Sequence, residues 1–195
     1  MAGKSYRNFL MELSDSRADN DEKIEKGYRL YIAGILEMGK DKVYYPDANF
    51  TMRLTYGTIG DYFPSDAVYY SYYTTLKGVM EKEDPDNWEF VVTDRLKDLY
   101  AKKDFGPYAD KNGEMPVCFI SNNDITGGNS GSPVINGKGH LIGLAFDGNW
   151  EAMSGDIVFE SEIQRTISVD IRYVLFIIDK YAGAKHLIDE MTIVR

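Results

Sequence analysis

The stretch that decides the fold is Thr126-Gly127-Gly128-Asn129-Ser130-Gly131-Ser132-Pro133-Val134. Ser130 stands between glycines just ahead of an apolar run, an arrangement that lets a serine hydroxyl stand clear of its own backbone as a nucleophile. Without a Cβ, Gly128 and Gly131 can adopt backbone angles that are closed to other residues. The N–H groups of Gly128 and Ser130 could then converge on the oxyanion that forms when the hydroxyl attacks a carbonyl. Ser130 is therefore the candidate nucleophile.

Two other interpretations compete with this one. A surface loop rich in Gly and Ser has a similar composition, but it does not require the ordered Gly-x-Ser-Gly-x-Pro followed by Val-Ile. A phosphate-binding loop of the Walker type requires Gly-Lys-Ser/Thr at the start of a helix, whereas Pro133, Val134 and Ile135 open a strand here. The nucleophile interpretation is the more specific of the three.

The composition narrows the classes of partner. The 195 residues carry 31 acidic against 22 basic side chains, a formal net charge of −9. Nucleic acids and membrane surfaces call for a basic patch, so we expect a peptide or a small molecule as partner instead. No apolar run approaches the ~20 residues of a membrane span. The single cysteine, Cys118, permits no internal disulfide, and the sequence suggests neither a metal site nor a cofactor.

The first part of the chain predicts a helix. Asn20 can cap a segment whose apolar residues recur at helical spacing up to Gly39. We interpret residues 1–45 as the end of a helical domain and residues 46–195 as a second, mostly β domain with terminal helices. After a break at 46–49, residues 50–56 alternate between apolar and polar side chains, which predicts a half-buried strand.

The later segments alternate between predicted strands and predicted helices. Residues 60–84 are aromatic without a clear period and predict mixed strand and loop. A helix is predicted from Asp84 to about Gly106, and a strand at 117–121. A hairpin is predicted at 134–142 around Asn136-Gly137-Lys138-Gly139, and a last strand at 164–169. The chain should end with a helix over 171–181, capped by Asp170 and ended by Gly183, and with a short terminal helix.

The predicted hairpin brings the chain back toward Ser130, so Phe146, Asp147 and Gly148 should lie beside it or just beyond it. A serine nucleophile needs a general base, and the sequence offers only His140 and His186. His140 lies at the far end of the hairpin, roughly 16 Å from Ser130 at ~3.3 Å per strand residue. His186 follows Gly183 and is expected at the surface. We therefore expect the base and its orienting acid to come from residues outside this sequence.

Residues 127–134, taken together with the run FDGNWEAMSGD at 146–156, resemble the bacterial serine dipeptidyl-peptidases of the dipeptidyl-peptidase 7 and 11 type. The nucleophile loop alone would also suit glutamyl endopeptidases, but the second run and the helical segment ahead of it favour the dipeptidyl-peptidases. The resemblance covers essentially the whole chain, matched to the C-terminal portion of the family. It implies the C-terminal β-barrel of a trypsin-like (chymotrypsin-fold) double-barrel peptidase. Such an enzyme takes its triad histidine and aspartate from the first barrel, so more chain is expected ahead of residue 1.

The resemblance implies a role for four residues. Ser130 matches the nucleophile, and Gly128 together with Ser130 matches the oxyanion hole. Asp147 matches the acid that helps to hold the substrate's terminal ammonium. Gly148 lies at the position where arginine goes with acidic side chains before the cut and glycine with apolar ones, which is closer to the dipeptidyl-peptidase 7 subtype. The family's histidine, triad aspartate, and the asparagine and tryptophan that complete amine binding are absent from this sequence.

We therefore expect a fragment of a serine dipeptidyl-peptidase, an aminopeptidase that releases N-terminal dipeptides with an apolar residue before the cut. Its partners would be a peptide with a free N-terminus and the missing N-terminal part of the same enzyme, without which the chain is expected to be inactive. The resemblance implies that the enzyme acts in the periplasm or at the surface of a Gram-negative bacterium. It is also compatible with a homodimer of the full-length enzyme. A glutamyl-type endopeptidase and a non-catalytic peptide-binding barrel are the alternatives.

Overall fold

The computed structural model describes residues 2–42, 44, 51–155 and 157–194, with side chains from residue 20 onward. The chain divides into two units, Met1–Asp47 and Ala48–Arg195, and each is described by itself. The predicted break at 46–49 and the start of the predicted strand at Phe50 lie outside the described residues.

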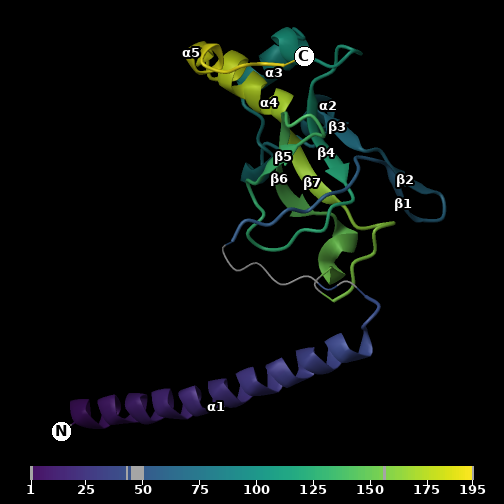
Figure 1. Cartoon of the computed structure of the whole chain (residues 1–195). Helices are drawn as coiled ribbons and strands as arrows, with labels where there is room; N and C mark the ends of the chain where they lie inside the picture. Colours follow the sequence, from purple (N-terminus) through teal and green to yellow (C-terminus); the bar gives the residue numbers. More distant parts are fainter. Residues whose placement is uncertain (1, 43, 45–50, 156, 195) are drawn as a thin grey trace. The chain divides into compact units, whose positions relative to one another are not determined.

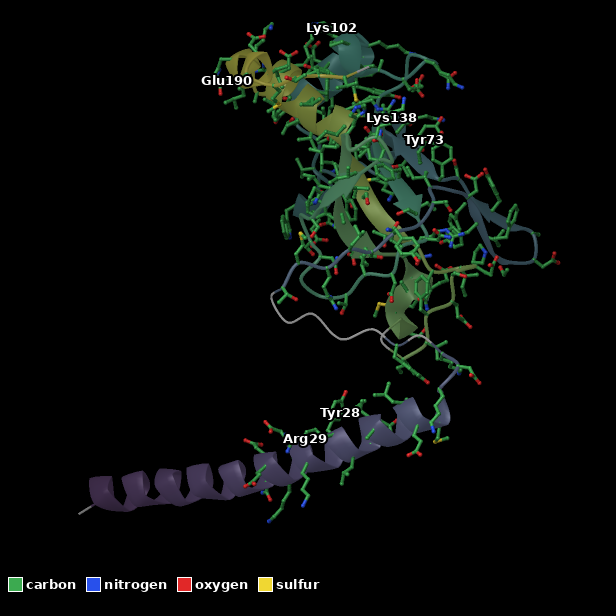
Figure 2. The ribbon with its side chains drawn as sticks, in the orientation of Figure 1. Tyr28, Arg29, Tyr73, Lys102, Lys138 and Glu190 are labelled. Carbon is green, nitrogen blue, oxygen red and sulfur yellow. The ribbon has the colours of Figure 1, made fainter. Side chains whose placement is uncertain are left out.

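The first unit contains one long helix, α1, at Ala2–Met38. The predicted helix is confirmed, and its end before Gly39 is confirmed too, since Gly39 N–H still donates to Ile35 O at 3.0 Å. The predicted cap at Asn20 is wrong, because the helix runs through this residue without interruption. An interior asparagine costs a helix only about 0.7 kcal/mol, so good helix formers on both sides override its preference for a cap. Tyr28 and Arg29 project from this helix (Figure 2).

The second unit is organised around a five-stranded antiparallel sheet in the order β3-β4-β7-β6-β5 (Figure 1). The strands are β3 (Tyr73–Thr75), β4 (Pro116–Ser121), β5 (Pro133–Ile135), β6 (Leu141–Gly148) and β7 (Thr166–Asp170). Two further strands, β1 (Tyr62–Ser65) and β2 (Val68–Tyr70), pair only with each other within the described residues. The strand predicted at 117–121, the hairpin and the last strand are confirmed to within a few residues.

The described residues form no closed barrel, so the barrel expected for this chain is not confirmed. The sheet is open, with β3 and β5 as its two edges. Closure would require pairing between these edges, and β5 is a strand of three residues that pairs with β6 alone in the described sheet.

The strand predicted at 50–56 is wrong for residues 51–56, which adopt no strand. Its apolar residues are almost fully exposed, with Met52 at 100%, Leu54 at 88% and Tyr56 at 87%. The alternation therefore does not sort side chains between a core and the solvent. Pairing begins only at Ile59, through an isolated bridge to Ser121 at the end of β4.

The helices of the second unit are mostly short. They are α2 (Leu76–Glu81), α3 (Asp94–Ala101), α4 (Ile171–Phe176) and α5 (Lys185–Asp189), with 3₁₀ turns η1 (Trp88–Phe90), η2 (Gly106–Tyr108) and η3 (Trp150–Ser154), and a π-helical turn η4 (Ile177–Tyr181) that continues α4.

The helix predicted from Asp84 begins ten positions later, at Asp94. The Asp84 carboxylate instead accepts a hydrogen bond from Asp86 N–H at 3.0 Å and holds a local turn, an alternative that aspartate side chains offer the backbone. The cap at Asp170 is confirmed, since its carboxylate accepts from Arg172 N–H at 2.9 Å. Gly183 follows the terminal turn with a φ of +72°, as predicted for a helix end.

The main core lies where helices pack on one end of the sheet. Leu76, Phe105, Met115 and Phe176 are buried there, and the rings of Phe105 and Phe176 meet edge to face with centroids 5.9 Å apart. Figure 1 shows α3, α4 and α5 gathered at this end. These helices do not cover the opposite end of the sheet, and the loop of residues 126–132, which carries the candidate nucleophile Ser130, lies there.

Candidate active site

Three strands of the sheet bring their ends together at the site. β4 ends at Ser121, β7 begins at Thr166 and β6 ends at Gly148, and both Ser121 and Gly148 lie opposite Thr166 in the ladder. The Thr166 hydroxyl donates to Asn123 O at 2.8 Å, which ties the start of the loop after β4 to β7. The sheet thus fixes both ends of the segment that carries Ser130.

The nucleophile loop is held by its own backbone and by β6. Thr126 N–H donates to the Asn129 side-chain oxygen at 3.1 Å, and Asn129 N–H donates back to Thr126 O at 3.2 Å. Gly131 N–H donates to Ala145 O at 2.7 Å. The φ angles of Gly128 and Gly131 are +103° and +81°, which residues with a Cβ rarely adopt. The backbone role predicted for these two glycines is therefore present.

The Ser130 hydroxyl is exposed and lies against β6, where its Oγ donates to Phe146 O at 3.2 Å. Phe146 is the extra residue of a bulge, because the ladder to β7 skips from Ala145 to Asp147. Bulges redirect backbone groups and are frequent beside active sites. The hairpin thus returns the chain to Ser130 as the sequence predicts.

The loop also offers backbone N–H groups as hydrogen-bond donors. Within the described part of the chain, the N–H groups of Gly128 and Ser130 have no hydrogen-bond acceptor, whereas those of Asn129, Gly131 and Ser132 have one. Two free backbone donors on either side of Asn129 are what an oxyanion needs.

Asp147 follows the bulge and is exposed. One carboxylate oxygen accepts from the adjacent Gly148 N–H at 2.8 Å. Among the described residues it forms no salt bridge. Its charge is thus available to a cationic group next to the nucleophile loop.

Gly148 does not border empty space. A Cβ built on it would lie 2.9 Å from the Cβ of Ala152, closer than side-chain carbons approach one another. The methyl group of Ala152, in η3, occupies the position that a side chain on residue 148 would take.

The sequence interpretation missed Asn149, which fastens η3 to β7. Its backbone N–H donates to Arg165 O at 2.9 Å, and its side-chain oxygen accepts from Arg165 N–H at 2.8 Å. Its side-chain nitrogen donates to Ile163 O and to the Glu151 carboxylate, both at 2.8 Å. Nothing in the sequence next to Asn149 indicates that its side chain bonds to a residue 16 positions away.

The Glu151 carboxylate also accepts from the hydroxyl of Tyr62 at 3.1 Å. Burial raises the pKa of Tyr62 above its ordinary value, and Glu151 raises it further. Arg165 is a residue only 8% exposed, and its guanidinium lies 5.2 Å from the centre of the Tyr62 ring. Strand β1 is thereby joined to the turn that follows Asp147 and Gly148.

Neither histidine approaches Ser130. His140 lies in the hairpin turn, where its backbone pairs with Asn136, and β6 separates it from Phe146 by roughly 20 Å of strand. Figure 2 shows Lys138, in the same turn, at the end of the sheet where α4 begins. His186 lies in α5. The structure therefore places Gly128 and Ser130 on a loop that contacts β6 at Phe146, directly before Asp147 and Gly148, and leaves both histidines away from this contact.

The described residues contain no group of three His, Cys, Asp or Glu side chains able to hold a metal ion. They also contain no helix with the length and apolarity to cross a membrane.

The comparisons with known proteins agree with each other. Residues 2–193 match the Peptidase S46 family. The chain is 62% identical over 187 residues to dipeptidyl-peptidase 7 of Phocaeicola vulgatus, a match that covers 96% of this chain and 26% of that protein. It is 59% identical over 189 residues to an Asp/Glu-specific dipeptidyl-peptidase of Porphyromonas gingivalis, with 97% and 26% covered.

A solved structure is similar as well. The crystal structure of Porphyromonas endodontalis DPP11 in complex with the dipeptide Arg-Glu matches with a TM-score of 0.77 and 55% identity, over 82% of this chain and 23% of that one. The chain thus spans about a quarter of the length of the relatives it matches.

Proposed function

Because the chain belongs to the Peptidase S46 family, we propose that it forms the nucleophile-bearing part of a serine dipeptidyl-peptidase that releases dipeptides from free N-termini. The observation that carries the proposal is the setting of Ser130. Its hydroxyl is exposed beside two backbone N–H groups without acceptors in the described chain, and the carboxylate of Asp147 follows next on the strand that it contacts.

In the proposed reaction, Ser130 Oγ gives up its hydrogen bond to Phe146 O and loses its proton to a general base as it attacks the carbonyl of the second peptide bond. The N–H groups of Gly128 and Ser130 stabilise the oxyanion. The intermediate collapses as the base returns its proton to the leaving amine. Water then hydrolyses the ester that joins the dipeptide to Ser130.

The general base and its orienting acid come from another part of the enzyme. His140 is separated from Phe146 by the length of β6, and His186 lies in the terminal helix. A proton transfer needs a heavy-atom distance of about 2.6 to 3.2 Å, which neither residue approaches. We propose that a histidine and an aspartate outside this sequence complete the triad.

Asp147 would set where the substrate stops. Two extended residues span about 7 Å, so a carboxylate just beyond the serine can bind the terminal ammonium only when the second peptide bond faces the nucleophile. This is the step that makes the enzyme an exopeptidase of the dipeptidyl type.

We propose an apolar side chain before the cut, because Gly148 and the methyl group of Ala152 present no charge there. The relatives include enzymes named as Asp/Glu-specific and others named dipeptidyl-peptidase 7, so family membership alone leaves this preference open. A series of dipeptidyl substrates that differ only in the residue before the cut measures it.

The larger architecture is part of the proposal. The open sheet would belong to the second barrel of a trypsin-like double-barrel peptidase, and residues 1–45 to a helical domain. The complete enzyme would act in the periplasm or at the cell surface, where the peptides it consumes are found.

The proposal is tested with pairs of peptides that are identical except for an acetyl group on the N-terminus. We expect the complete enzyme to release dipeptides from the free peptide and to cleave the blocked one at least a hundredfold more slowly. Equal cleavage of both would identify an endopeptidase instead. Tight binding of the free peptide without cleavage would identify a peptide-binding domain.

A further inference from the structure

We propose that Ala152 is a second specificity-determining residue, which acts together with Gly148 on the side chain before the cut. The proposal rests on the proposed function and deepens it. Gly148 alone does not decide which side chain fits, because the methyl group of Ala152 occupies the space that any side chain on residue 148 would need.

The contact between the two positions is close and isolated. A Cβ on Gly148 would lie 2.9 Å from the Cβ of Ala152, and its next neighbour among the described residues is Arg165 O at an ordinary 3.9 Å. Gly148 is not one of the glycines with a positive φ, so its backbone tolerates a side chain. The obstacle to a substitution at 148 is therefore a single methyl group.

That methyl group cannot move aside easily. Ala152 N–H donates to Asn149 O at 3.0 Å, and Gly155 N–H donates to Ala152 O at 2.9 Å. Asn149 is fastened to Arg165 by hydrogen bonds in both directions, at 2.8 and 2.9 Å. A side chain at 148 would have to shift the whole η3 turn, whereas an alanine methyl group has no rotamer that removes it.

A small hollow borders Ala152. Ala152, Gly155 and Gln164 line this hollow together with Asp124 and Ile125, which lead into the nucleophile loop. Gln164 is 1% exposed, and its side-chain oxygen has no hydrogen-bond partner in the described residues. The hollow therefore contains a buried acceptor, which would lie 3.4 Å from a Cβ built on Gly155.

These observations predict a paired requirement. Glycine at 148 with alanine at 152 gives an uncharged wall, which suits an apolar side chain before the cut. An arginine at 148 needs glycine at 152, because only then can its side chain pass without displacing η3. Its guanidinium would then be free to pair with a carboxylate before the cut.

The test uses the complete enzyme in four forms: wild type, Gly148→Arg, Ala152→Gly and the double variant. kcat/KM is measured on free-N-terminal dipeptidyl-aminomethylcoumarin substrates with leucine or aspartate before the cut. We expect Gly148→Arg alone to lose at least about tenfold on both substrates. Ala152→Gly alone removes a methyl group from the apolar wall, so its kcat/KM on leucine should fall by about tenfold.

In the double variant we expect the aspartate-to-leucine ratio of kcat/KM to rise at least about a hundredfold over wild type. The matched control is Gly148→Arg combined with Met153→Gly, because Met153 lies in the same turn with its side chain 80% exposed. This control adds a flexible glycine without removing the methyl group, and it should not restore activity.

A Gly148→Arg single variant that shifts the ratio as far as the double variant would overturn the proposal, as would equal restoration by Met153→Gly. If the arginine variants do not fold, Gly148→Ala is used, which adds only the Cβ. Its melting temperature should fall below that of wild type and recover when Ala152→Gly is added, and no recovery would contradict the contact. A wild-type enzyme that releases no dipeptide would instead defeat the proposed function.

Discussion

At the scale of the residue, the site depends on which backbone and side-chain groups are left without partners. Asp147 has a charge that no described cation neutralises, and Gly128 and Ser130 have donors that no described acceptor takes. The serine and its neighbouring glycines could be recognised in the sequence from their residue types alone. The steric role of Ala152 could not be predicted, because contact between positions 148 and 152 depends on the exact path of a turn.

Asp147→Asn in the complete enzyme should lower kcat/KM on substrates with a free N-terminus by roughly ten- to a thousandfold. A charge-assisted hydrogen bond contributes about 1.5 to 3 kcal/mol, and stranding a desolvated ammonium costs about 3 to 5 kcal/mol. Blocked peptides never use the ammonium, so their slow cleavage should change much less. Equal losses on both kinds of peptide would show that Asp147 supports the loop rather than the substrate.

Gly128→Ala should cost activity with little loss of folding stability. Its φ of +103° is strained for a residue with a Cβ, by about 1 to 3 kcal/mol, so the loop should relax and misplace an oxyanion donor. We expect kcat to fall by roughly 10²- to 10³-fold. Gly127→Ala is the matched control, since its φ is not positive and its Cβ would meet nothing within 4 Å. Similar losses of kcat in both variants would show that backbone strain at residue 128 is not the cause.

At the scale of the element, strands that pair locally could be predicted and segments that depend on distant partners could not. The hairpin is encoded by Asn136, whose side-chain oxygen accepts from Lys138 N–H and His140 N–H, and by Gly139 at a φ of +82°. Residues 51–56 show the same alternation as a strand, yet they belong to no strand of the described structure. Periodicity reports a suitable side-chain pattern but not the presence of a neighbour.

The clamp at Asn149 should hold η3 against β7. Asn149→Ala removes the acceptor of Arg165 N–H and should cost about 1 to 3 kcal/mol locally, because the donor is partly buried. Hydrogen exchange followed by mass spectrometry should show faster exchange at 163–166 and a lower kcat/KM. Asn87→Ala is the control, since it also removes a side-chain oxygen that accepts from a backbone N–H, here that of Glu89 in the exposed turn η1. Unchanged exchange at 163–166 would remove Asn149 from this role.

At the scale of the whole molecule, the proposed active site needs a general base from elsewhere. In this proposal the chain contributes the nucleophile, the oxyanion donors and a carboxylate, while the register of β6 keeps His140 at the other end of the sheet. We predict that the 195-residue chain alone releases no dipeptide above background. Release that disappears in Ser130→Ala would contradict this and would require a base within the chain.

The most direct test of the central claim, that Ser130 is the nucleophile, is covalent labelling of the complete enzyme with a fluorophosphonate. Such probes react with activated serine hydroxyls and leave a stable adduct that peptide mass spectrometry can locate. We expect a single adduct on Ser130, loss of dipeptide release in step with labelling, and no adduct in Ser130→Ala. An enzyme that releases dipeptides but carries the adduct on another serine, or that keeps its rate in Ser130→Ala, would contradict the assignment.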